Sequence, residues 1–421
     1  MVHLPAVPPL DRNGRLVLLG KAFRAFGFGL NSVVLGLYLV ELGLDAAAVG
    51  AVLSAALVGT TLLTLIIAIF GDRLGRRRVL ATGGALMLLS LFVPLVGANP
   101  LLLVLIALSG MVAVTANENT GLQSLDQAIL PQTTDPRHRT AAFATYGLLA
   151  SVAVALGGLA VGPLVALGTA LGLEGADHFA PAFVVYALAG LATVAAAGAM
   201  TAGAEPPTPE PEAGAVAAAR RRFGIHRSRG PVLRLSLLFG LDAFAGGLIV
   251  QSFLAIWFSQ TFGLAPAAIG ALFFAGNLLA AASYPAAALL SARIGLIRTM
   301  VFTHIPSSVL LIAMTLVPWA PVAAFFYLGR AAISSMDIPA RQSYTMAIVD
   351  PDERTATAGV TSLARSIAQS AGPLLSAALV PLGLGVPLVV CGVLKIGYDL
   401  SLYVGFRARP APEEGALRRA G

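Results

Sequence analysis

Twelve long apolar runs follow one another along this chain of 421 residues, and they constrain its fold more than any other feature. A helix needs about 20 apolar residues to cross the hydrocarbon core of a bilayer, and each run approaches or exceeds that length. Transmembrane β-strands would be short and alternating, whereas these runs are apolar on all sides. Charged residues make up 11% of the chain, against about 25% in a soluble domain. The sequence therefore predicts an all-α integral membrane protein.

The runs form two sets of six, separated by one change of composition. We predict spans near residues 16–40, 47–70, 79–97, 101–126, 141–168 and 180–202, and then near 232–259, 266–290, 299–317, 320–345, 355–380 and 386–406. The segment between the sets is rich in Pro, Glu and Arg and has too little apolar surface to pack. We expect an N-terminal six-helix bundle over 1–203, a cytoplasmic linker over 204–231, and a C-terminal six-helix bundle with a short tail over 232–421.

The basic residues lie on one set of connecting loops. Four arginines separate the second and third runs, and five more lie in the central segment. The alternate loops contain neither Lys nor Arg and lie near 41–46, 97–100, 169–180, 260–265, 318–321 and 381–385. The positive-inside rule then places both termini and the central segment in the cytoplasm. We expect the membrane to be the inner (plasma) membrane. The net charge of +7 is thus a topology signal, and we expect no nucleic-acid partner.

The two sets of runs are related as an internal repeat. Residues 43–53, GLDAAAVGAVL, match residues 263–273, GLAPAAIGALF, and the same shift places Gly75 on Gly295. Because six spans is an even number, the two copies have the same orientation across the membrane. The two copies of such a parallel repeat are related by a pseudo-two-fold axis along the membrane normal. A ligand site is then expected between the copies, near the bilayer midplane.

The sharpest motif lies between the second and third runs and reads Gly71-Asp72-Arg73-Leu74-Gly75-Arg76-Arg77-Arg78. It resembles the loop signature G-x-x-x-D-R-x-G-R-R of the major facilitator superfamily of secondary transporters, although Ala68 replaces the leading glycine. The resemblance covers nearly the whole chain, as twelve spans divided six and six. It implies the fold of that superfamily, two six-helix bundles that work by alternating access, in a protein that is a monomer and not an enzyme.

The resemblance also implies a cytoplasmic gate at this loop. Gly75 permits a tight turn, and the Asp72 carboxylate would cap the N-terminus of the eleventh helix from the other half. The arginines of the loop, Arg73 and Arg76 among them, would pair with Asp126 at the end of the fourth helix. The alternative is a positive-inside anchor with no switching role, which we prefer for Arg77 and Arg78.

Polar residues inside the predicted spans are the candidate functional residues, because a charge at the bilayer centre costs roughly 3 kcal/mol or more. In the superfamily, helices 1, 4, 7 and 10 line the central cavity. The residues that we expect to line the cavity or take part in coupling are Arg24, Asn31, Asn117, Glu118, Asn119, Asp242, Gln251, Arg330, Asp337 and, on the eleventh helix, Arg365.

Depth in the membrane suggests two pairs, which are Arg24 with Glu118 and Asp242 with Arg330. A spacing of four residues on one helix suggests two more, which are Asp337 with Arg341 and Lys395 with Asp399. The last pair is expected to be structural, because helix 12 is peripheral in this fold. Glu118 and Asp242 are the leading protonation sites, since burial and a nearby arginine act in opposite directions on a carboxylate. Permanent salt bridges are the alternative for both acids.

We expect proton-linked transport of a small organic solute, with export by antiport favoured by Gly158 and Gly162-Pro163. These residues resemble part of the superfamily's antiporter motif, G-x-x-x-G-P. Uptake of an organic anion by symport is the alternative suggested by the arginines, and a receptor or sensor that no longer transports is the alternative from another class. Asn117 stands where the superfamily's R-x-x-Q-G motif has arginine, so the coupling route stays open. The chain lacks a P-loop, H-E-x-x-H and CxxC, so we expect no catalytic, metal or cofactor site.

Overall fold

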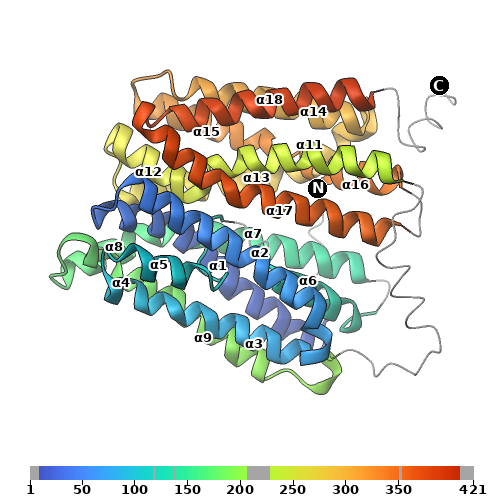
Figure 1. Ribbon diagram of the computed structural model, residues 1–421. Helices are drawn as coiled ribbons and strands as arrows, with labels where there is room; N and C mark the ends of the chain where they lie inside the picture. The colour runs from blue at the N-terminus through green and yellow to red at the C-terminus, as the bar shows by residue number, and fades with distance from the viewer. Residues whose placement is uncertain (1–8, 117–119, 136–137, 206–227, 350–352, 408–421) are drawn as a thin grey trace, which may run out of the picture. The chain divides into compact units, whose positions relative to one another are not determined.

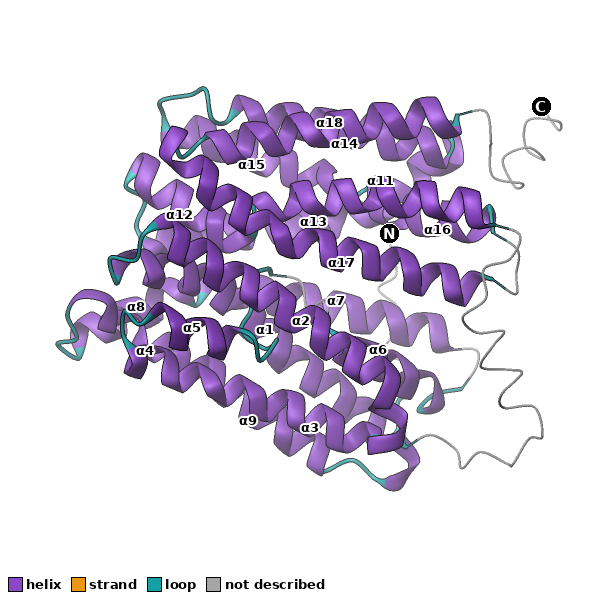
Figure 2. Ribbon diagram, viewed as in Figure 1, coloured by secondary structure: helices purple, strands orange, loops and turns teal. Residues whose placement is uncertain are grey.

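The computed structural model describes residues 9–116, 120–135, 138–205, 228–349 and 353–407. Helices and the loops between them account for all of these residues, and no strand occurs among them (Figure 2). By length and composition alone, nine helices in the described part of the chain suffice to cross a membrane. The prediction of an all-α membrane fold is confirmed.

Three of the twelve predicted spans are not among those nine. The fourth is divided into α5 (Pro100–Ala107) and α6 (Gly121–Ile129), and the tenth into α15 (Ala320–Ser334) and α16 (Asp337–Ala347). The eleventh, α17 (Arg354–Leu379), is long enough but too polar to qualify. The fourth and tenth spans are equivalent in the predicted repeat, so the two halves break the same helix.

By its contacts the chain divides into two compact units (Figure 1). Unit 1 comprises residues 1–207 and 250–278, and unit 2 comprises 208–249 and 279–421. The segment 250–278, which belongs to the second half in sequence, therefore packs with unit 1. The six-and-six division at 203 and 232 stays a prediction.

Unit 1 consists mainly of helices from the first half of the chain. Its α-helices are α1 (Arg12–Glu41), α2 (Ala46–Leu74), α3 (Arg76–Met87), α4 (Phe92–Val96), α5, α6, α7 (Arg139–Leu159), α8 (Val161–Ala170), α9 (Ala180–Gly198), α12 (Gln251–Phe262) and the first part of α13 (Pro266–Ile294). Short 3₁₀ turns join some of them, at Leu88–Leu91, Leu130–Gln132, Gly175–Phe179 and Ala202–Ala204.

Helix α1 is the central helix of unit 1. The most apolar 18-residue window of α1 is 83% buried, against 44% for α2 and 39% for the stretch Ala141–Ala170. Helices α7, α9 and α12 pack around α1, whereas α2 and α7 leave apolar side chains on the outside. A helix that is buried on all sides tolerates polar residues only where they have partners, which makes the charges on α1 informative.

The irregular stretch between α5 and α6 is held by side chains from other helices. Tyr186 donates a hydrogen bond to the Met111 carbonyl, and Asn31 Nδ2 donates to the Ala113 carbonyl at 3.0 Å. The Ser252 backbone N–H donates to the Val114 carbonyl at 3.3 Å. Non-helical backbone is tolerated at membrane depth only where such partners replace the lost helical bonds. Unit 1 meets that condition with groups from α1, α9 and α12.

Unit 2 contains the remaining helices. They are α11 (Arg229–Leu248), the rest of α13, α14 (Leu296–Ala313), α15, α16, α17 and α18 (Val386–Phe406), with a 3₁₀ turn at Val380–Leu382. Helix α11 packs against α17 and α18, and α14 packs against α15, α16 and α18. A Cβ built on Gly247 of α11 would lie 3.1 Å from the Gly372 Cα of α17, so two glycines let these helix backbones meet.

The repeat is visible in the backbone of two turns. Gly75 joins α2 to α3 with φ +91°, and Gly295 joins α13 to α14 with φ +90°. Both values lie in a region that glycine adopts readily and other residues adopt with strain. The two positions that the sequence repeat aligns therefore carry the same turn, one in each unit.

Candidate functional site

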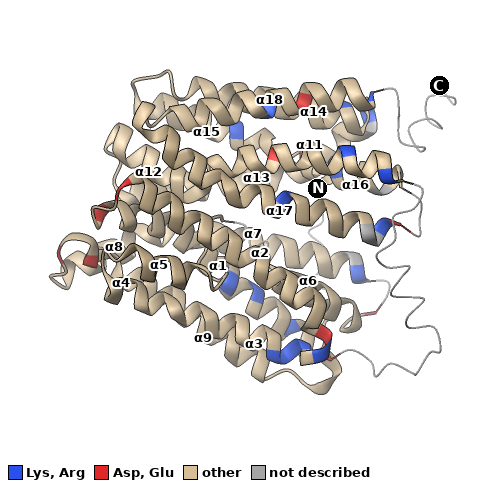
Figure 3. Cartoon of the chain, viewed as in Figure 1, with Lys and Arg blue, Asp and Glu red and all other residues tan. Residues whose placement is uncertain are grey.

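Buried charges gather in one place in unit 2. We call this set the unit 2 charge cluster, and its members are Asp242 (α11), His304 (α14), Asp337 and Arg341 (α16), Arg365 (α17), and Lys395 and Asp399 (α18). Charged residues of both signs are coloured in Figure 3. Five helices contribute to the cluster, so it joins parts of the sequence more than 150 residues apart, such as Asp242 and Lys395.

Asp242 is the centre of this cluster and is only 4% exposed. Its Oδ1 accepts a hydrogen bond from Lys395 Nζ at 2.6 Å. Its Oδ2 accepts from Arg365 at 3.0 Å and from Arg341 at 3.3 Å. One carboxylate is thus shared by three cations from α16, α17 and α18, an arrangement that keeps it ionised as long as all three stay in place.

The outer acids of the cluster have partners of their own. Asp337 accepts from Arg341 at 2.9 Å, one helical turn along α16. Asp399 contacts His304 Nδ1 at 3.0 Å, and the Nε2 atom of the same imidazole lies 3.4 Å from Lys395 Nζ. With His304 neutral, the three carboxylates balance the three permanent cations, so the cluster carries no net charge.

Two of the expected pairs in unit 2 are wrong. Asp242 binds Lys395, Arg365 and Arg341 rather than Arg330, and Lys395 binds Asp242 rather than Asp399. For Asp242 and Arg330 the physical reason is rotational position around each helix axis, which an estimate of depth does not include. For Lys395 and Asp399 the reason is competition from partners on α11 and α14. The expected pair of Asp337 with Arg341 is confirmed.

Arg330 lies on α15 and is half-buried. Among the described residues its guanidinium forms no ion pair within 4.0 Å, whereas Arg341 and Arg365 both have a carboxylate. A guanidinium presents five N–H donors in a planar fork that matches carboxylates and phosphates. Among the described residues, Arg330 is therefore a half-buried cation of unit 2 that is available to an anionic ligand.

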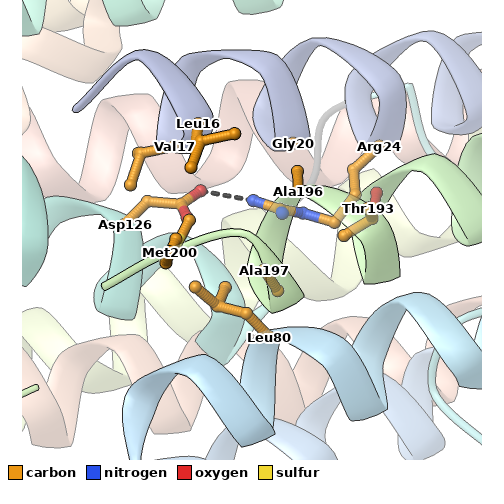
Figure 4. A pocket seen from close by; sticks show the side chains of 10 residues that line it. All are labelled: Leu16, Val17, Gly20, Arg24, Leu80, Asp126, Thr193, Ala196, Ala197 and Met200. Atoms are coloured by element: carbon orange, nitrogen blue, oxygen red, sulfur yellow. Dashed lines mark hydrogen bonds and ion pairs between the residues drawn. The ribbon is translucent and has the colours of Figure 1, made fainter. Parts of the chain in front are cut away.

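Unit 1 holds a second buried ion pair, between Arg24 of α1 and Asp126 of α6. Both residues are nearly inaccessible, at 1% and 0% exposed, and they point toward each other in a pocket lined mostly by apolar side chains (Figure 4). Tyr146 of α7 donates a further hydrogen bond to Asp126 at 3.0 Å. Lys21, one turn before Arg24, contacts Gln123 at 3.5 Å and lies over the Tyr146 ring.

The expected pair of Arg24 with Glu118 stays a prediction, because Glu118, together with Asn117 and Asn119, lies outside the described residues. Within the described residues Arg24 binds Asp126. Asp126 was expected to bind the arginines of the loop between α2 and α3. It lies on α6, which begins at Gly121, and it contacts Arg24 and Tyr146. Its role in the gate stays a prediction.

The loop between α2 and α3 is held by acids of its own unit. Arg76 Nε donates to Asp72 at 2.9 Å, and the backbone N–H groups of Arg76 and Arg77 donate to the Glu205 carboxylate at 2.6 and 3.3 Å. Glu205 therefore caps the N-terminus of α3, where free N–H groups favour an anion. Asp72 and Arg73 are exposed. The gating role of Asp72, Arg73, Gly75 and Arg76 stays a prediction.

Two of the predicted cavity residues, the amides Asn31 and Gln251, lie at helix breaks of unit 1. Asn31 is 1% exposed and uses Nδ2 to hold the broken fourth helix, while its Oδ1 is buried without a hydrogen-bond partner among the described residues. Gln251 begins α12 directly after the break at Ile249–Val250, and its Nε2 is likewise buried without a described partner. Buried polar atoms without partners are uncommon in folded proteins, so both are candidate ligand contacts.

Sequence reasoning missed the part played by α14 and α18. His304, Lys395 and Asp399 were visible as three ionisable residues in two apolar runs, but the peripheral position of helix 12 suggested a separate structural pair. The useful signal was their number, since ionisable groups within membrane spans are rare and are usually paired with one another. Among the described residues no group of His, Cys, Asp or Glu has the arrangement of a metal site.

Comparisons with known proteins agree on a family. The model of the Major Facilitator Superfamily matches residues 17–373, with a second match over 235–420. An uncharacterized membrane protein of Saccharomyces cerevisiae is 25% identical over 418 residues, which covers 93% of each chain.

Solved transporters share the fold at low sequence identity. A bacterial homologue of the human lysosomal transporter Spinster, in an inward-facing and occupied conformation, is 18% identical with a TM-score of 0.71, covering 94% of this chain and 96% of that one. The nucleoside transporter NupG is 15% identical with a TM-score of 0.69, covering 95% and 99%. A POT family transporter in complex with a thioalcohol-conjugated peptide is 13% identical with a TM-score of 0.68, covering 95% and 98%.

Proposed function

The chain belongs to the Major Facilitator Superfamily, and from that premise we propose that it couples the movement of a small organic solute to a proton, with Asp242 as the coupling carboxylate. The family membership makes the chain a multi-pass membrane transporter and not an enzyme. The coupling ion, the direction and the class of solute are parts of the proposal, as are its location in the plasma membrane with both termini in the cytoplasm and its monomeric state.

The observation that carries the proposal is that three cations share the carboxylate of Asp242. Its carboxylate is buried in a predicted membrane span and is balanced by cations that three different helices supply. A carboxylate that keeps all three cations stays ionised. A buried carboxylate that loses them is left as an uncompensated charge in a medium of low polarity, and binding a proton is the least costly response.

Alternating access supplies the motion that such a site needs. Any rearrangement of α16, α17 or α18 against α11 changes the distance from Asp242 to its cations, and therefore its affinity for a proton. A proton bound on one side of the membrane and released on the other couples the transport cycle to the proton gradient. Asp126 of unit 1, paired with Arg24, offers a second carboxylate in a similar setting.

The preference for export rests on the fifth predicted span. Its Gly158 lies at the end of α7 and its Gly162 begins α8, so the partial antiporter motif sits at a helix junction. A Cβ built on Gly162 would lie 2.6 Å from the Ala267 Cβ of α13, which means that the glycine permits a close crossing inside unit 1. Close packing by small residues is the simpler explanation of the motif, and direction therefore has to be measured.

Uptake of an organic anion by symport is the second candidate. Arg330 favours it, because this half-buried guanidinium lacks an ion pair within the described part of the chain. The side chain of Arg365, a member of the unit 2 charge cluster, is 29% exposed and is therefore also accessible to an anion. If anions are carried, Arg330→Gln removes their binding while proton binding at Asp242 remains.

The experiment has two stages. A thermal-shift screen of the purified protein across classes of organic compounds identifies a ligand, and flux of that compound is then followed in liposomes with and without an imposed pH gradient. We expect the gradient to drive flux, and we expect Asp242→Asn to remove the effect of the gradient while exchange at equal pH continues. Asp177→Asn, at an exposed loop position, is the matched control.

The results separate the candidates. Gradient-driven flux that survives both Glu118→Gln and Asp242→Asn refutes proton coupling through these acids. Movement of the compound in the direction opposite to the proton flow identifies antiport. Movement in the same direction as the proton identifies symport. A compound that binds without any flux would identify a receptor.

A further inference from the structure

His304 is the imidazole of the unit 2 charge cluster, and a neutral imidazole has one nitrogen that donates a proton and one that can accept a proton. It is 5% exposed and lies on α14, which packs against α15, α16 and α18. The groups in direct contact with it or nearest to it are Lys395, Tyr398 and Asp399 from α18 and Asp242 from α11. The other helices that pack against α14 carry Asp337, Arg341 and Tyr344 on α16, and Tyr327 and Arg330 on α15.

The neighbours of His304 determine which ring nitrogen carries the proton. The Lys395 ammonium has three donors and no acceptor, so the Nε2 atom that lies 3.4 Å from it has to be the acceptor. The proton of a neutral imidazole is then on Nδ1, where it is donated to Asp399 at 3.0 Å. These contacts are those of a neutral His304 whose Nε2 lone pair accepts from Lys395.

One carboxylate oxygen connects His304 to the centre of the cluster. Lys395 Nζ lies 2.6 Å from Asp242 Oδ1, and His304 Nε2 lies 3.8 Å from the same atom. If Nε2 gains a proton, it changes from an acceptor of Lys395 into a cationic donor to Asp242. Two cations 3.4 Å apart then compete for one oxygen.

We propose that His304 is the proton-loading side chain of the unit 2 charge cluster, and that protonation of its Nε2 displaces Lys395 from Asp242. The proton comes from water and forms one N–H bond with the Nε2 lone pair, no other covalent bond changes, and the reverse step returns the proton to water. The charge of the cluster rises from zero to +1. This inference rests on the proposed proton coupling and identifies the residue that first receives the proton.

Displacing Lys395 has a structural consequence. Lys395 is the residue by which α18 reaches Asp242 on α11, whereas Asp399 keeps α18 attached to α14 through His304. Protonation therefore loosens α18 from α11 and strengthens its ion pair with α14. Helices α14 and α18 thus act as a pair that responds to protons and releases α11 when His304 is protonated. His304 is a positioning residue in this scheme, because it acts on Asp242 through Lys395.

A reporter for this loosening is already present on α18. Cys391 is the sole cysteine of the chain, it is fully buried, and it lies one helical turn before Lys395. We would label the purified full-length protein in detergent with N-ethylmaleimide between about pH 5.5 and 8. Because thiol reactivity itself changes with pH, the quantity of interest is the ratio of the labelling rate of the wild type to that of His304→Gln at each pH.

We expect this ratio to be near one at the alkaline end and to rise severalfold at the acidic end, since glutamine stays neutral throughout. His178→Gln, which changes a histidine of unit 1, is the matched control and should follow the wild type at every pH. A ratio that does not change with pH, or wild-type labelling that stays undetectable, overturns the proposal. If His304→Gln does not elute as a folded monodisperse protein, His304→Asn takes its place.

The test is separable from that of the proposed function. If Asp242→Asn abolishes gradient-driven flux while His304→Gln keeps the wild-type labelling and pH profile, the inference about His304 fails and proton coupling stands. If gradient-driven flux survives Asp242→Asn, the proposed coupling fails, whatever His304 does to the labelling of Cys391.

Discussion

Replacing Asp242 by asparagine tests whether one carboxylate holds unit 2 together. Asn has nearly the same shape as Asp and removes only the charge. Arg341 keeps Asp337 at 2.9 Å, so its environment changes least. Lys395 and Arg365 lose the carboxylate that they approach at 2.6 and 3.0 Å. The charge cluster changes from neutral to +1, with two cations left in a buried setting.

The magnitude follows from how buried these cations are. Removing one partner of a buried ion pair costs about 3–5 kcal/mol, because the other charge stays desolvated. Two cations are affected here, but the Lys395 and Arg365 side chains are 11% and 29% exposed and can turn partly toward water. We therefore expect Asp242→Asn to lower the free energy of unfolding by about 3–5 kcal/mol in total, rather than by twice that amount.

A second substitution should restore much of this loss. Lys395→Met keeps a long side chain in the same space and removes one of the two uncompensated cations. Since a buried pair replaced by neutral side chains of similar volume is often as stable as the pair itself, the double variant Asp242→Asn/Lys395→Met should recover about half of the loss or more.

The assay is denaturant unfolding in detergent, followed by circular dichroism and analysed as a double-mutant cycle that includes Lys395→Met alone. Asp177→Asn, exposed in unit 1, is the control for a loss of charge without a loss of ion pairs. If Asp242→Asn unfolds within about 1 kcal/mol of the wild type, or if the double variant is no more stable than the single one, the reasoning about a shared carboxylate is refuted.

Three further substitutions test other contacts. Gly372→Ala places a Cβ against the backbone of Gly247 and should cost about 1–3 kcal/mol or more, whereas Gly359→Ala on the same helix meets open space and should be neutral, as judged by melting temperature. Glu205→Gln removes the anionic cap of α3 and should cost about 0.3–1 kcal/mol, seen as faster proteolysis of the loop before α3. Ser252→Ala removes hydrogen bonds to two carbonyls of unit 1 and should cost about 1 kcal/mol in the unfolding assay.

The sequence predicted the class of fold, the tight turn of the repeat and one local ion pair correctly. Long apolar runs are sufficient to predict membrane helices because the bilayer imposes a length and excludes charge. The turns at Gly75 and Gly295 and the pair of Asp337 with Arg341 are also local, since each depends on residues within one turn of the chain. In these cases spacing along the sequence decides the distance in space.

Spacing alone gave the wrong result for Lys395 and Asp399. They are four residues apart on α18, as Asp337 and Arg341 are on α16, yet each binds a residue from another helix. The reason is competition, because Asp242 of α11 and His304 of α14 reach the same positions at hydrogen-bonding distance. Which partner is present depends on how α11 and α14 pack against α18, and no periodicity within α18 contains that information.

The sequence by itself determined that the chain is helical, crosses a membrane, repeats internally and carries a small set of charges inside apolar segments. Only the tertiary structure decided which charges meet, because the neighbour of each side chain depends on rotation about the helix axis and on the breaks in the fourth and tenth spans, at residues 108–116 and 335–336. The sequence shows which charges lie in apolar segments and therefore require a partner. The packing of helices that lie far apart in the chain determines which residue that partner is.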